Sequence, residues 1–515
     1  MQKVVNTLVS FFSWNLRALA SSLAPSEGPA GGANTAGKVI LYSLQFFTKT
    51  LPLAFLLALS LPLALVAKAI GLLLGNNHET VFAAFEKNPD WNQPIDNEIE
   101  IGVTTSEYQV NGADNFPNSS WAQWEKSRHP SGAPCIEDED RSGRSLDFWR
   151  KPQDLIDKLR LLNLKRYRFS VEWSAVEPEK GLIDQEALQR YKSLCEALKE
   201  AGIEPFVTLH HFSDPTWFLR EGGFEKEHNI GLFTGFAETV HKALSPWVKE
   251  WVTFNEPAIY AFQGYFRGEY PPGVKDAYRT GSVLKHLLQA HCQTYDRLKP
   301  LDGAGKIGIA HNFLRFKPYS PYNPLEKLAC HYLTMITHRS VMDFFRTGQF
   351  QFQIPLAANL FFQEHSIKDK FDFFGVQYYT DPLIRMEPSS KIMDSTCYPH
   401  EKMTDMPYRF FPQGLATALE ECHALGKPIW ITETGAAAKD DDQKEFIEKA
   451  LRAASFAKSR GIDVTRVHVW TLQDNFEWNM GWKKRFGLFS FNPLTQEANL
   501  RPSGKLIQEL TSLCT

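Results

Sequence analysis

The segments Thr253-Phe254-Asn255-Glu256-Pro257 and Ile431-Thr432-Glu433-Thr434-Gly435 are the most informative part of this 515-residue chain. Each closes an apolar run, residues 248–254 and 428–432, whose composition predicts a buried β-strand. Each places one glutamate where the strand gives way to a loop. Two carboxyl groups that face each other across a cleft can cleave a glycosidic bond, because one protonates the leaving oxygen and the other attacks the anomeric carbon. The alternative is that each glutamate is a surface charge at a strand end.

Strand-like and helix-like runs alternate along the chain from residue 98 onward. Eight runs are predicted as strands: residues 99–104, 166–171, 204–209, 248–254, 306–311, 371–377, 428–432 and 465–471. Between them lie amphipathic segments such as 152–163, 185–201 and 410–425, and glycines stand where two of these helices should end. Eight strand–helix units predict an α/β fold, a (β/α)8 TIM barrel, whose chemistry lies at the carboxyl ends of the strands. The two glutamates end the fourth and seventh predicted strands.

Further motifs follow in order along the same span. They are Thr105-Ser106-Glu107-Tyr108-Gln109, Tyr167-Arg168-Phe169-Ser170, Thr208-Leu209-His210-His211-Phe212, Phe374-Gly375-Val376-Gln377-Tyr378-Tyr379, Trp470-Thr471-Leu472-Gln473-Asp474-Asn475-Phe476-Glu477-Trp478 and Lys484-Arg485-Phe486-Gly487-Leu488. With the two glutamate segments, this series resembles glycoside hydrolase family 1, the β-glucosidase and β-galactosidase family, from about residue 98 to about residue 510. The resemblance implies a retaining mechanism, in which two carboxyl groups lie about 5 to 5.5 Å apart.

The resemblance also assigns roles to individual residues. Glu256 would be the acid/base, and Glu433 would be the nucleophile that forms a covalent glycosyl-enzyme. Arg168 would keep Glu433 ionised, and Tyr379 would donate a hydrogen bond to it. The remaining family positions are implied sugar ligands: Asn255 for the 2-hydroxyl, Gln109, His211 and Glu477 for other glycone hydroxyls, Trp470 as a stacking surface and Trp478 as a further contact.

Several positions depart from the family pattern. Thr434 replaces an asparagine beside the nucleophile, and Gln377 replaces another two residues before Tyr379. A glutamate, an aspartate and an arginine of the family are replaced here by Asn111, Ser213 and Ala175. None of these changes removes a predicted catalytic group. Because small displacements beside catalytic carboxylates alter rate and acceptor choice, these positions bear on the reaction that the barrel carries out.

The amino-terminal hundred residues have a different composition from the barrel. Residues 1–37 predict an amphipathic interfacial helix followed by a linker rich in glycine, proline and alanine. Residues 38–75 predict a hydrophobic membrane-anchor segment, and residues 76–97 predict a second linker. The barrel would then occupy residues 98–515, outside the bilayer and on a side that the sequence does not decide.

The membrane-anchor prediction depends on an uncharged run at residues 51–67. With its apolar neighbours on both sides, this run is long enough to cross a bilayer once. Pro52 and Pro62 leave a single span and a re-entrant hairpin both open, because proline is tolerated in either structure. A buried helix of the soluble domain is the remaining alternative.

Composition narrows the range of cofactors and partners. The net charge is −3 and no basic stripe occurs in the barrel region, which argues against nucleic acid as a partner. The seven cysteines are scattered and form no Cys-x-x-Cys pair, which argues against a disulfide framework and a zinc site. Because no glycine-rich phosphate loop or metal-ligand spacing occurs, we expect neither a metal nor another cofactor. The oligomeric state stays open.

These observations favour a membrane-anchored retaining β-glycosidase that acts on β-D-glucosides or β-D-galactosides, with glycolipids among its substrates. A transglycosylase is the alternative, since an anchor joined to a family 1 barrel is similar to the plant chloroplast-envelope galactosyltransferase that moves galactose between galactolipids. Hydrolysis and transfer share the covalent intermediate and differ in whether water or a sugar hydroxyl resolves it. A catalytically inactive glycan-binding barrel is disfavoured, because both glutamates are present.

Overall fold

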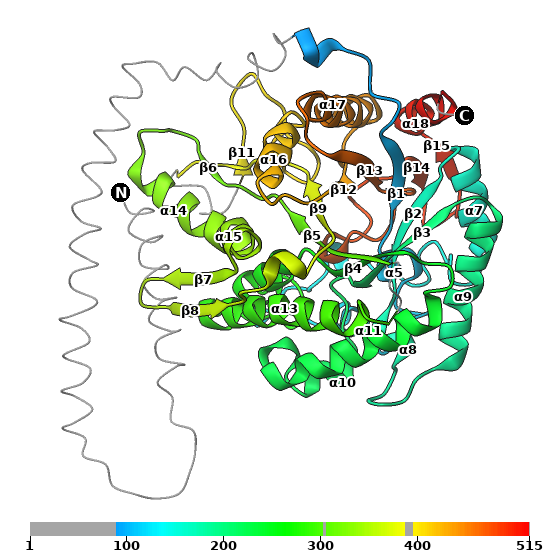
Figure 1. The fold of residues 1–515 in the computed structure, drawn as a ribbon, viewed down its shortest axis with the longest axis horizontal. Coiled ribbons are helices and arrows are strands. Elements are labelled where there is room, and N and C mark those ends of the chain that lie inside the picture. The colour runs from blue at the N-terminus through cyan, green and yellow to red at the C-terminus, as the bar shows by residue number, and fades with distance from the viewer. Residues whose placement is uncertain (1–88, 302–304, 387–394, 514–515) are drawn as a thin grey trace, which may run out of the picture. The chain divides into compact units, whose positions relative to one another are not determined.

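Eight parallel strands close into a barrel in the computed structural model, which describes residues 89–301, 305–386 and 395–513 (Figure 1). The barrel strands are β1 (Glu100–Thr104), β2 (Arg166–Ser170), β3 (Glu204–His210), β4 (Glu250–Asn255), β5 (Lys306–Asn312), β9 (Phe373–Tyr378), β12 (Ile429–Thr434) and β13 (Val464–Trp470). Each falls on one of the eight predicted strands, so the prediction of a (β/α)8 barrel is confirmed. The strand β12 continues to Thr434, so Glu433 lies inside this strand, whereas the sequence had predicted that the strand ends before it.

The strand β1 closes the barrel by pairing with β13 on one side and β2 on the other. Thr104, the last residue of β1, lies opposite both Trp470 and Arg168. The predicted sugar-stacking ring and the predicted partner of the nucleophile therefore stand at the same level of the barrel, on the strands that flank the carboxyl end of β1.

Helices lie outside the strands (Figure 1). The longer ones are α7 (Pro152–Leu161), α9 (Gln185–Glu200), α11 (Ile230–Leu244), α13 (Ala277–Leu298), α15 (Ser340–Thr347), α16 (Gly414–His423), α17 (Asp440–Ser459) and α18 (Pro502–Ser512). Two of these helices have a side-chain cap at their amino end. The Asp184 carboxylate accepts hydrogen bonds from backbone N–H groups of α9, and the Asp276 carboxylate accepts one from a backbone N–H of α13. The predicted helix at 410–425 begins later, at Gly414.

The barrel interior contains a layer of apolar side chains from five neighbouring strands, β3, β4, β5, β9 and β12. Phe206, Val252, Ala310, Phe373 and Trp430 form one fully buried cluster, and the rings of Phe373 and Trp430 stack with centroids 3.7 Å apart. Because this layer is closed to water, polar chemistry is confined to the carboxyl ends of the strands.

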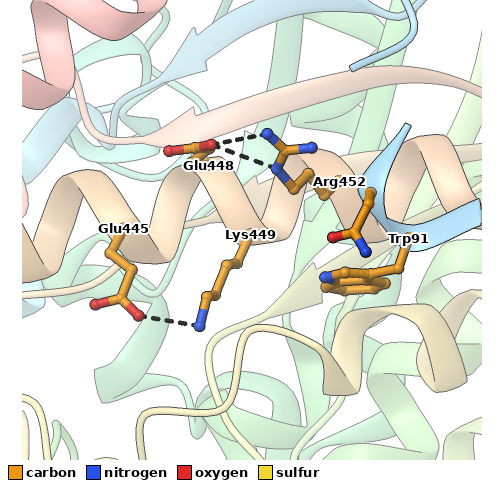
Figure 2. Close-up of a pocket in the computed structure, with 6 residues that line it drawn as sticks. Trp91, Glu445, Glu448, Lys449 and Arg452 are labelled. Carbon is orange, nitrogen blue, oxygen red and sulfur yellow. Dashed lines mark hydrogen bonds and ion pairs between the residues drawn. The ribbon is translucent and has the colours of Figure 1, made fainter. Parts of the chain in front are cut away.

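The segment before β1 lies against α17. In the 3-10 helix η2 (Pro89–Asn92), the indole ring of Trp91 meets the ring of Phe456 edge-on at 5.9 Å. A cavity of about 480 Å³ lies beside it, lined by Trp91, Asn92 and four charged residues of α17 that form two 3.0 Å ion pairs: Glu445 with Lys449 and Glu448 with Arg452 (Figure 2). The cavity has no residue in common with the predicted active site.

A second, smaller unit of the described chain comprises residues 316–333, 382–386 and 395–398. Here β6 (Lys317–Pro318), β10 (Leu383–Ile384) and β11 (Ser395–Thr396) form a three-stranded sheet, and α14 (Pro324–Thr334) begins in the same unit. Two antiparallel pairs complete the strand inventory of the described residues: β7 (Gln349–Ile354) with β8 (Ala358–Gln363), and β14 (Phe489–Phe491) with β15 (Ala498–Leu500).

The amphipathic segment and the membrane anchor predicted within residues 1–75 lie outside the described residues. Among the helices that the structure does describe, none is both long and apolar enough to traverse a bilayer.

Candidate active site

Glu256 and Glu433 stand at the carboxyl ends of β4 and β12, and both strands change register there. Trp430 belongs to the barrel interior, so strict alternation along β12 would turn Glu433 outward. The pairing with β9 shifts between Ile431 and Glu433, and β4 shifts in the same way before Asn255. Such irregularities redirect side chains near active sites, and here they bring both glutamate segments to face inward.

Three residues with left-handed backbone conformations surround the same site. Glu256 has a φ of 44°, and Phe212 and Trp478, which follow His211 and Glu477, have φ values of 64° and 50°. Non-glycine residues adopt this conformation at an energetic cost, and such positions cluster at functional sites. All three adjoin or coincide with a predicted catalytic or sugar-binding residue.

The carboxylate of Glu433 is held by a cation and a phenol. Arg168 Nη1 donates to Glu433 Oε1 at 2.7 Å, and the Tyr379 hydroxyl donates to Oε2 at 2.7 Å. Burial raises the pKa of Glu433, and the charge of Arg168 together with the two hydrogen bonds offsets part of that rise. Both oxygens are thus engaged by groups that favour the ionised form.

Glu256 has a different set of neighbours. Asn312 Nδ2, at the end of β5, donates to Glu256 Oε1 at 2.8 Å. Burial raises the pKa of Glu256 well above its ordinary value, and the negative charge of Glu433 raises it further. Of the two carboxyls, Glu256 therefore keeps the proton while Glu433 carries the charge.

The side-chain amide of Asn255 is oriented by three neighbours. Its Oδ1 accepts from Arg168 Nη2 and Gln377 Nε2, both at 2.7 Å, and its Nδ2 lies 3.0 Å from His211 Nε2. Burial and the charge of Arg168 hold the pKa of His211 well below its ordinary value, so its ring is neutral and Nε2 accepts. This leaves one N–H of Asn255 and the Nδ1–H of His211 without a protein partner among the described residues, as a sugar ligand requires.

Gln109 and Glu477 form a second polar pair. Gln109 Nε2 donates to Glu477 Oε2 and to the backbone oxygen of Phe476, each at 3.0 Å. Burial raises the pKa of Glu477 to about 8, and the charge of Glu433 contributes to the rise. The Gln109 Oε1 atom has no partner within the described part of the chain and is available to a hydroxyl.

The aromatic residues complete the enclosure. The His211 ring lies 5.9 Å from Trp470 and 6.0 Å from Trp478 between ring centroids. Trp470 packs against Phe486 and Ala437, with Tyr379 beside them. The structure therefore brings together the residues predicted to be catalytic, sugar-binding or supporting, and it adds Asn312. It also places Gln377, one of the departures from the family pattern, on Asn255. In the described ranges, no group of three or more His, Cys, Asp or Glu side chains is arranged to hold a metal ion.

A second pair of buried carboxyls lies next to this site. Burial raises the pKa of Glu107 to about 8 and that of Glu172 to about 7. Their hydrogen-bond donors are neutral: Asn111 Nδ2 donates to Glu107 at 2.9 Å, and the hydroxyls of Ser174 and Ser213 donate to Glu172 at 2.6 and 2.9 Å. Asn111 and Ser213 are two of the positions that depart from the family pattern, and their joint departure was the signal that could have revealed this pair.

Comparison with known proteins agrees with this geometry. The model of Glycosyl hydrolase family 1 matches residues 93–513. Beta-glucosidase A of Acetivibrio thermocellus is 30% identical over 435 residues, which cover 79% of this chain and 96% of the relative. Beta-glucosidase A of Thermotoga maritima is 26% identical over 422 residues, or 78% and 94% of the two chains. A solved beta-glucosidase from Exiguobacterium marinum aligns with a TM-score of 0.74 at 25% identity, covering 82% of this chain and 99% of that one.

Proposed function

Because the chain belongs to glycosyl hydrolase family 1 and is therefore a retaining O-glycosyl hydrolase, we propose that Glu433 is its nucleophile and Glu256 its acid/base. The observation that carries this assignment is the asymmetry between the two carboxyls. Arg168 and Tyr379 engage both oxygens of Glu433, whereas Glu256 has a neutral amide, that of Asn312, on one oxygen. The first arrangement favours an anion and the second favours a proton donor.

The reaction then proceeds in two displacements. Glu433 attacks the anomeric carbon as Glu256 donates its proton to the leaving oxygen, so the glycosidic bond breaks and a glycosyl-ester forms. Glu256, now ionised, takes a proton from the incoming water, and attack of that oxygen on the anomeric carbon releases Glu433. The free N–H of Asn255 donates to the sugar 2-hydroxyl, and this bond strengthens as positive charge develops at the anomeric carbon.

The donor sugar is a hexose in β-linkage, either a β-D-glucoside or a β-D-galactoside. Three groups support this choice: Gln109 Oε1 and His211 Nδ1–H have no partner among the described residues, and the Glu477 carboxyl accepts from the Gln109 amide. The His211 ring also lies 5.9 Å from that of Trp470. An aromatic ring together with hydrogen-bond donors and acceptors suits a pyranose with several hydroxyls. The two curated relatives described above are beta-glucosidases.

The test is to trap the intermediate. Full-length protein incubated with an activated 2-deoxy-2-fluoro-β-glucoside or -galactoside should lose activity and gain one sugar per chain, because the fluorine slows breakdown of the glycosyl-ester. Peptide mass spectrometry should find the sugar on Glu433. A label on another residue, or turnover confined to α-glycosides, would overturn the proposal.

Residues 38–75 are proposed to anchor the chain in a membrane with the barrel outside the bilayer. The uncharged run at 51–67 supports this, because such a run partitions strongly into lipid. Tethering restricts the barrel to substrates within reach of the bilayer, which favours glycolipids over soluble disaccharides. Full-length protein should float with vesicles and resist carbonate extraction, whereas release by salt alone would refute the anchor. Protease digestion of sealed vesicles identifies the side that the barrel faces.

Transfer between glycolipids is the second candidate function. Tethering favours it, because headgroup hydroxyls at a bilayer surface compete with water for the glycosyl-enzyme. With a β-galactolipid in vesicles as the only substrate, transfer should yield lipids with additional sugars in amounts equal to the deglycosylated lipid. Release of free galactose without sugar-extended lipids would assign the enzyme to hydrolysis.

A further inference from the structure

The hairpin formed by β7 and β8 (Figure 1) differs in composition from the chain as a whole. Residues 347–363 contain no Asp, Glu, Lys or Arg, in a chain of which 22% is charged. Leu356 in the turn is 60% exposed, and Phe361 on the outer face is 59% exposed. Exposed hairpins in water usually carry charges that prevent association of their edges. Its other exposed side chains include Gln349, Gln351, Gln353 and Asn359, which are polar but uncharged. A hairpin without charges that exposes a leucine in its turn and a phenylalanine beside it indicates a surface that something covers.

The hairpin is fixed firmly to the barrel on its inner face. Phe350 and Phe352 are fully buried, and a methyl group built on Gly281 of α13 would lie 2.5 Å from Phe352 and 2.7 Å from Leu360. At this closeness the hairpin lies directly on α13. The exposed residues are therefore presented by a rigid element.

The direction of the hairpin follows from its contacts along α13. Near the turn, Phe352 and Leu360 meet Gly281 in the first part of the helix. At the other end, the ring of Phe345, which precedes the hairpin in α15, lies 5.4 Å from that of His291, ten residues further along α13. The turn thus points toward the amino end of α13. Since α13 leads from the loop after Glu256 to the start of β5, its amino end lies at the catalytic end of the barrel.

We propose that the turn at residues 354–357 and Phe361 insert into the lipid interface of a bilayer, as a membrane contact additional to the amino-terminal segment, with the catalytic end of the barrel turned toward the lipid. A bilayer is the occupant that the composition fits, because lipid rejects charged side chains while accepting leucine and phenylalanine. Tyr278 is 53% exposed in the first turn of α13, with the exposed Lys275 just before it. Tyrosine and lysine are the residues expected at headgroup level.

This inference extends the proposed anchoring and depends on it for the presence of a bilayer. The direct test places a fluorophore on an introduced Ala357→Cys in the full-length chain, bound to vesicles of phosphatidylcholine and phosphatidylglycerol. The control is Leu494→Cys, because Leu494 is 92% exposed in the turn between β14 and β15. Labelled unsubstituted chain gives the background from native cysteines. Brominated lipids should quench the probe at 357 several-fold more than the probe at 494.

A second pair of variants separates this proposal from the anchor and from catalysis. The double variant Leu356→Glu/Phe361→Glu in the Ala357→Cys background should lose the quenching, because two carboxylates oppose insertion, while the protein still floats with vesicles and hydrolyses a nitrophenyl glycoside normally. Leu494→Glu in the same Ala357→Cys background should change none of these readouts. Matching melting temperatures show that the variants fold.

Each other outcome overturns the proposal in a recognisable way. If the chain floats but the probes at 357 and 494 are quenched equally, the proposed anchor stands and the proposed hairpin contact is refuted. If the chain does not float, both proposals are refuted. A probe at 357 whose emission changes with protein concentration in the absence of lipid shows that a second copy of the chain covers the patch instead.

Discussion

Two pairs of buried glutamates lie close together at the catalytic end of this barrel, and they differ in what surrounds them. Glu256 and Glu433 share their site with the guanidinium of Arg168, which is fully buried. Glu107 and Glu172 have amide, phenol and serine hydroxyl neighbours as their hydrogen-bond donors. Burial raises the pKa of all four carboxyls, so burial alone does not distinguish the pair proposed to be catalytic from the other pair.

The difference lies in the fixed cation. A carboxylate in a low-dielectric site stays ionised when a positive charge is built in beside it, whereas neutral donors are compatible with a protonated carboxyl. Arg168 therefore stabilises the state in which one carboxyl of the first pair is ionised and the other is protonated, as a retaining glycosidase requires. The second pair has no cation beside it in the described part of the chain, so its carboxyls can be protonated at neutral pH.

The largest expected effect follows removal of the charged carboxyl. Glu433→Ala should lower turnover of a nitrophenyl β-glycoside by roughly 10⁴-fold or more, the scale on which covalent catalysis is lost. Azide added to the variant should restore part of the rate and give a glycosyl azide of inverted configuration, because the small anion occupies the space of the lost carboxylate. Wild-type rates in Glu433→Ala would show that the nucleophile is elsewhere.

Glu256→Ala should have a smaller effect that depends on the leaving group. Loss of the proton donor should slow hydrolysis of an alkyl glycoside by about 10²- to 10⁴-fold. A dinitrophenyl glycoside should glycosylate Glu433 of this variant at a rate near that of the wild type, because its leaving group needs no proton. Pre-steady-state release of dinitrophenol measures this step, and azide should here give a product of retained configuration. Equal losses on both substrates would contradict the acid/base role.

Changing the cation itself tests the distinction between the two pairs. In Arg168→Met the pKa of Glu433 should rise, because burial remains and the compensating charge is lost. The acidic limb of the pH profile of kcat/KM, which reports ionisation of the nucleophile, should then move to higher pH. At a pH below the new pKa, the rate falls about tenfold for each pH unit. A matched Arg466→Met, which alters an arginine at the amino end of β13, should leave the limb in place.

The eight barrel strands could be predicted because each is a short apolar run that ends in turn residues. Glu256 and Glu433 could be predicted because their segments end two of those runs. The sequence could not show how they turn inward, since period-two alternation from Trp430 directs Glu433 outward and the shift in β12 depends on its neighbour β9. Strand pairing of this kind is a property of the closed barrel and has no local signal.

Other parts of the site were missed for a related reason. Asn312 directly follows the strand predicted at residues 306–311, but the sequence does not specify which carboxyl it contacts. Glu107 belongs to one motif and Glu172 lies two residues after another, and they come together where β1 and β2 lie side by side. The β7–β8 hairpin lies between α15 and β9, in the connection from β5 to β9. The alternation of eight strands with helices predicts only a helix in that connection. These features depend on residues distant in sequence, and each needed the tertiary structure.

The smallest expected effect concerns the second pair and is an effect on stability rather than on rate. Glu107 is fully buried, and its pKa rises from an ordinary 4.5 to about 8. Between these two values the folded state binds more protons at this position than the unfolded state does. The free energy of unfolding should therefore fall as the pH rises through this window, by at most about 1.4 kcal/mol per pH unit for this carboxyl.

Glu107→Gln removes the titrating proton while keeping a side chain of the same shape. Relative to wild type, the variant should gain stability steadily from pH 5 to pH 8 and gain nothing further above the folded pKa. Urea unfolding at several pH values measures the difference, and Glu200→Gln, an exposed position at the end of α9, is the matched control that should follow wild type throughout. Parallel curves for Glu107→Gln and wild type would mean that Glu107 is ionised in the folded protein. In that case a cation would not be what distinguishes the two pairs, and the contrast between them would have to rest on the hydrogen bonds of Tyr379 and Asn312 alone.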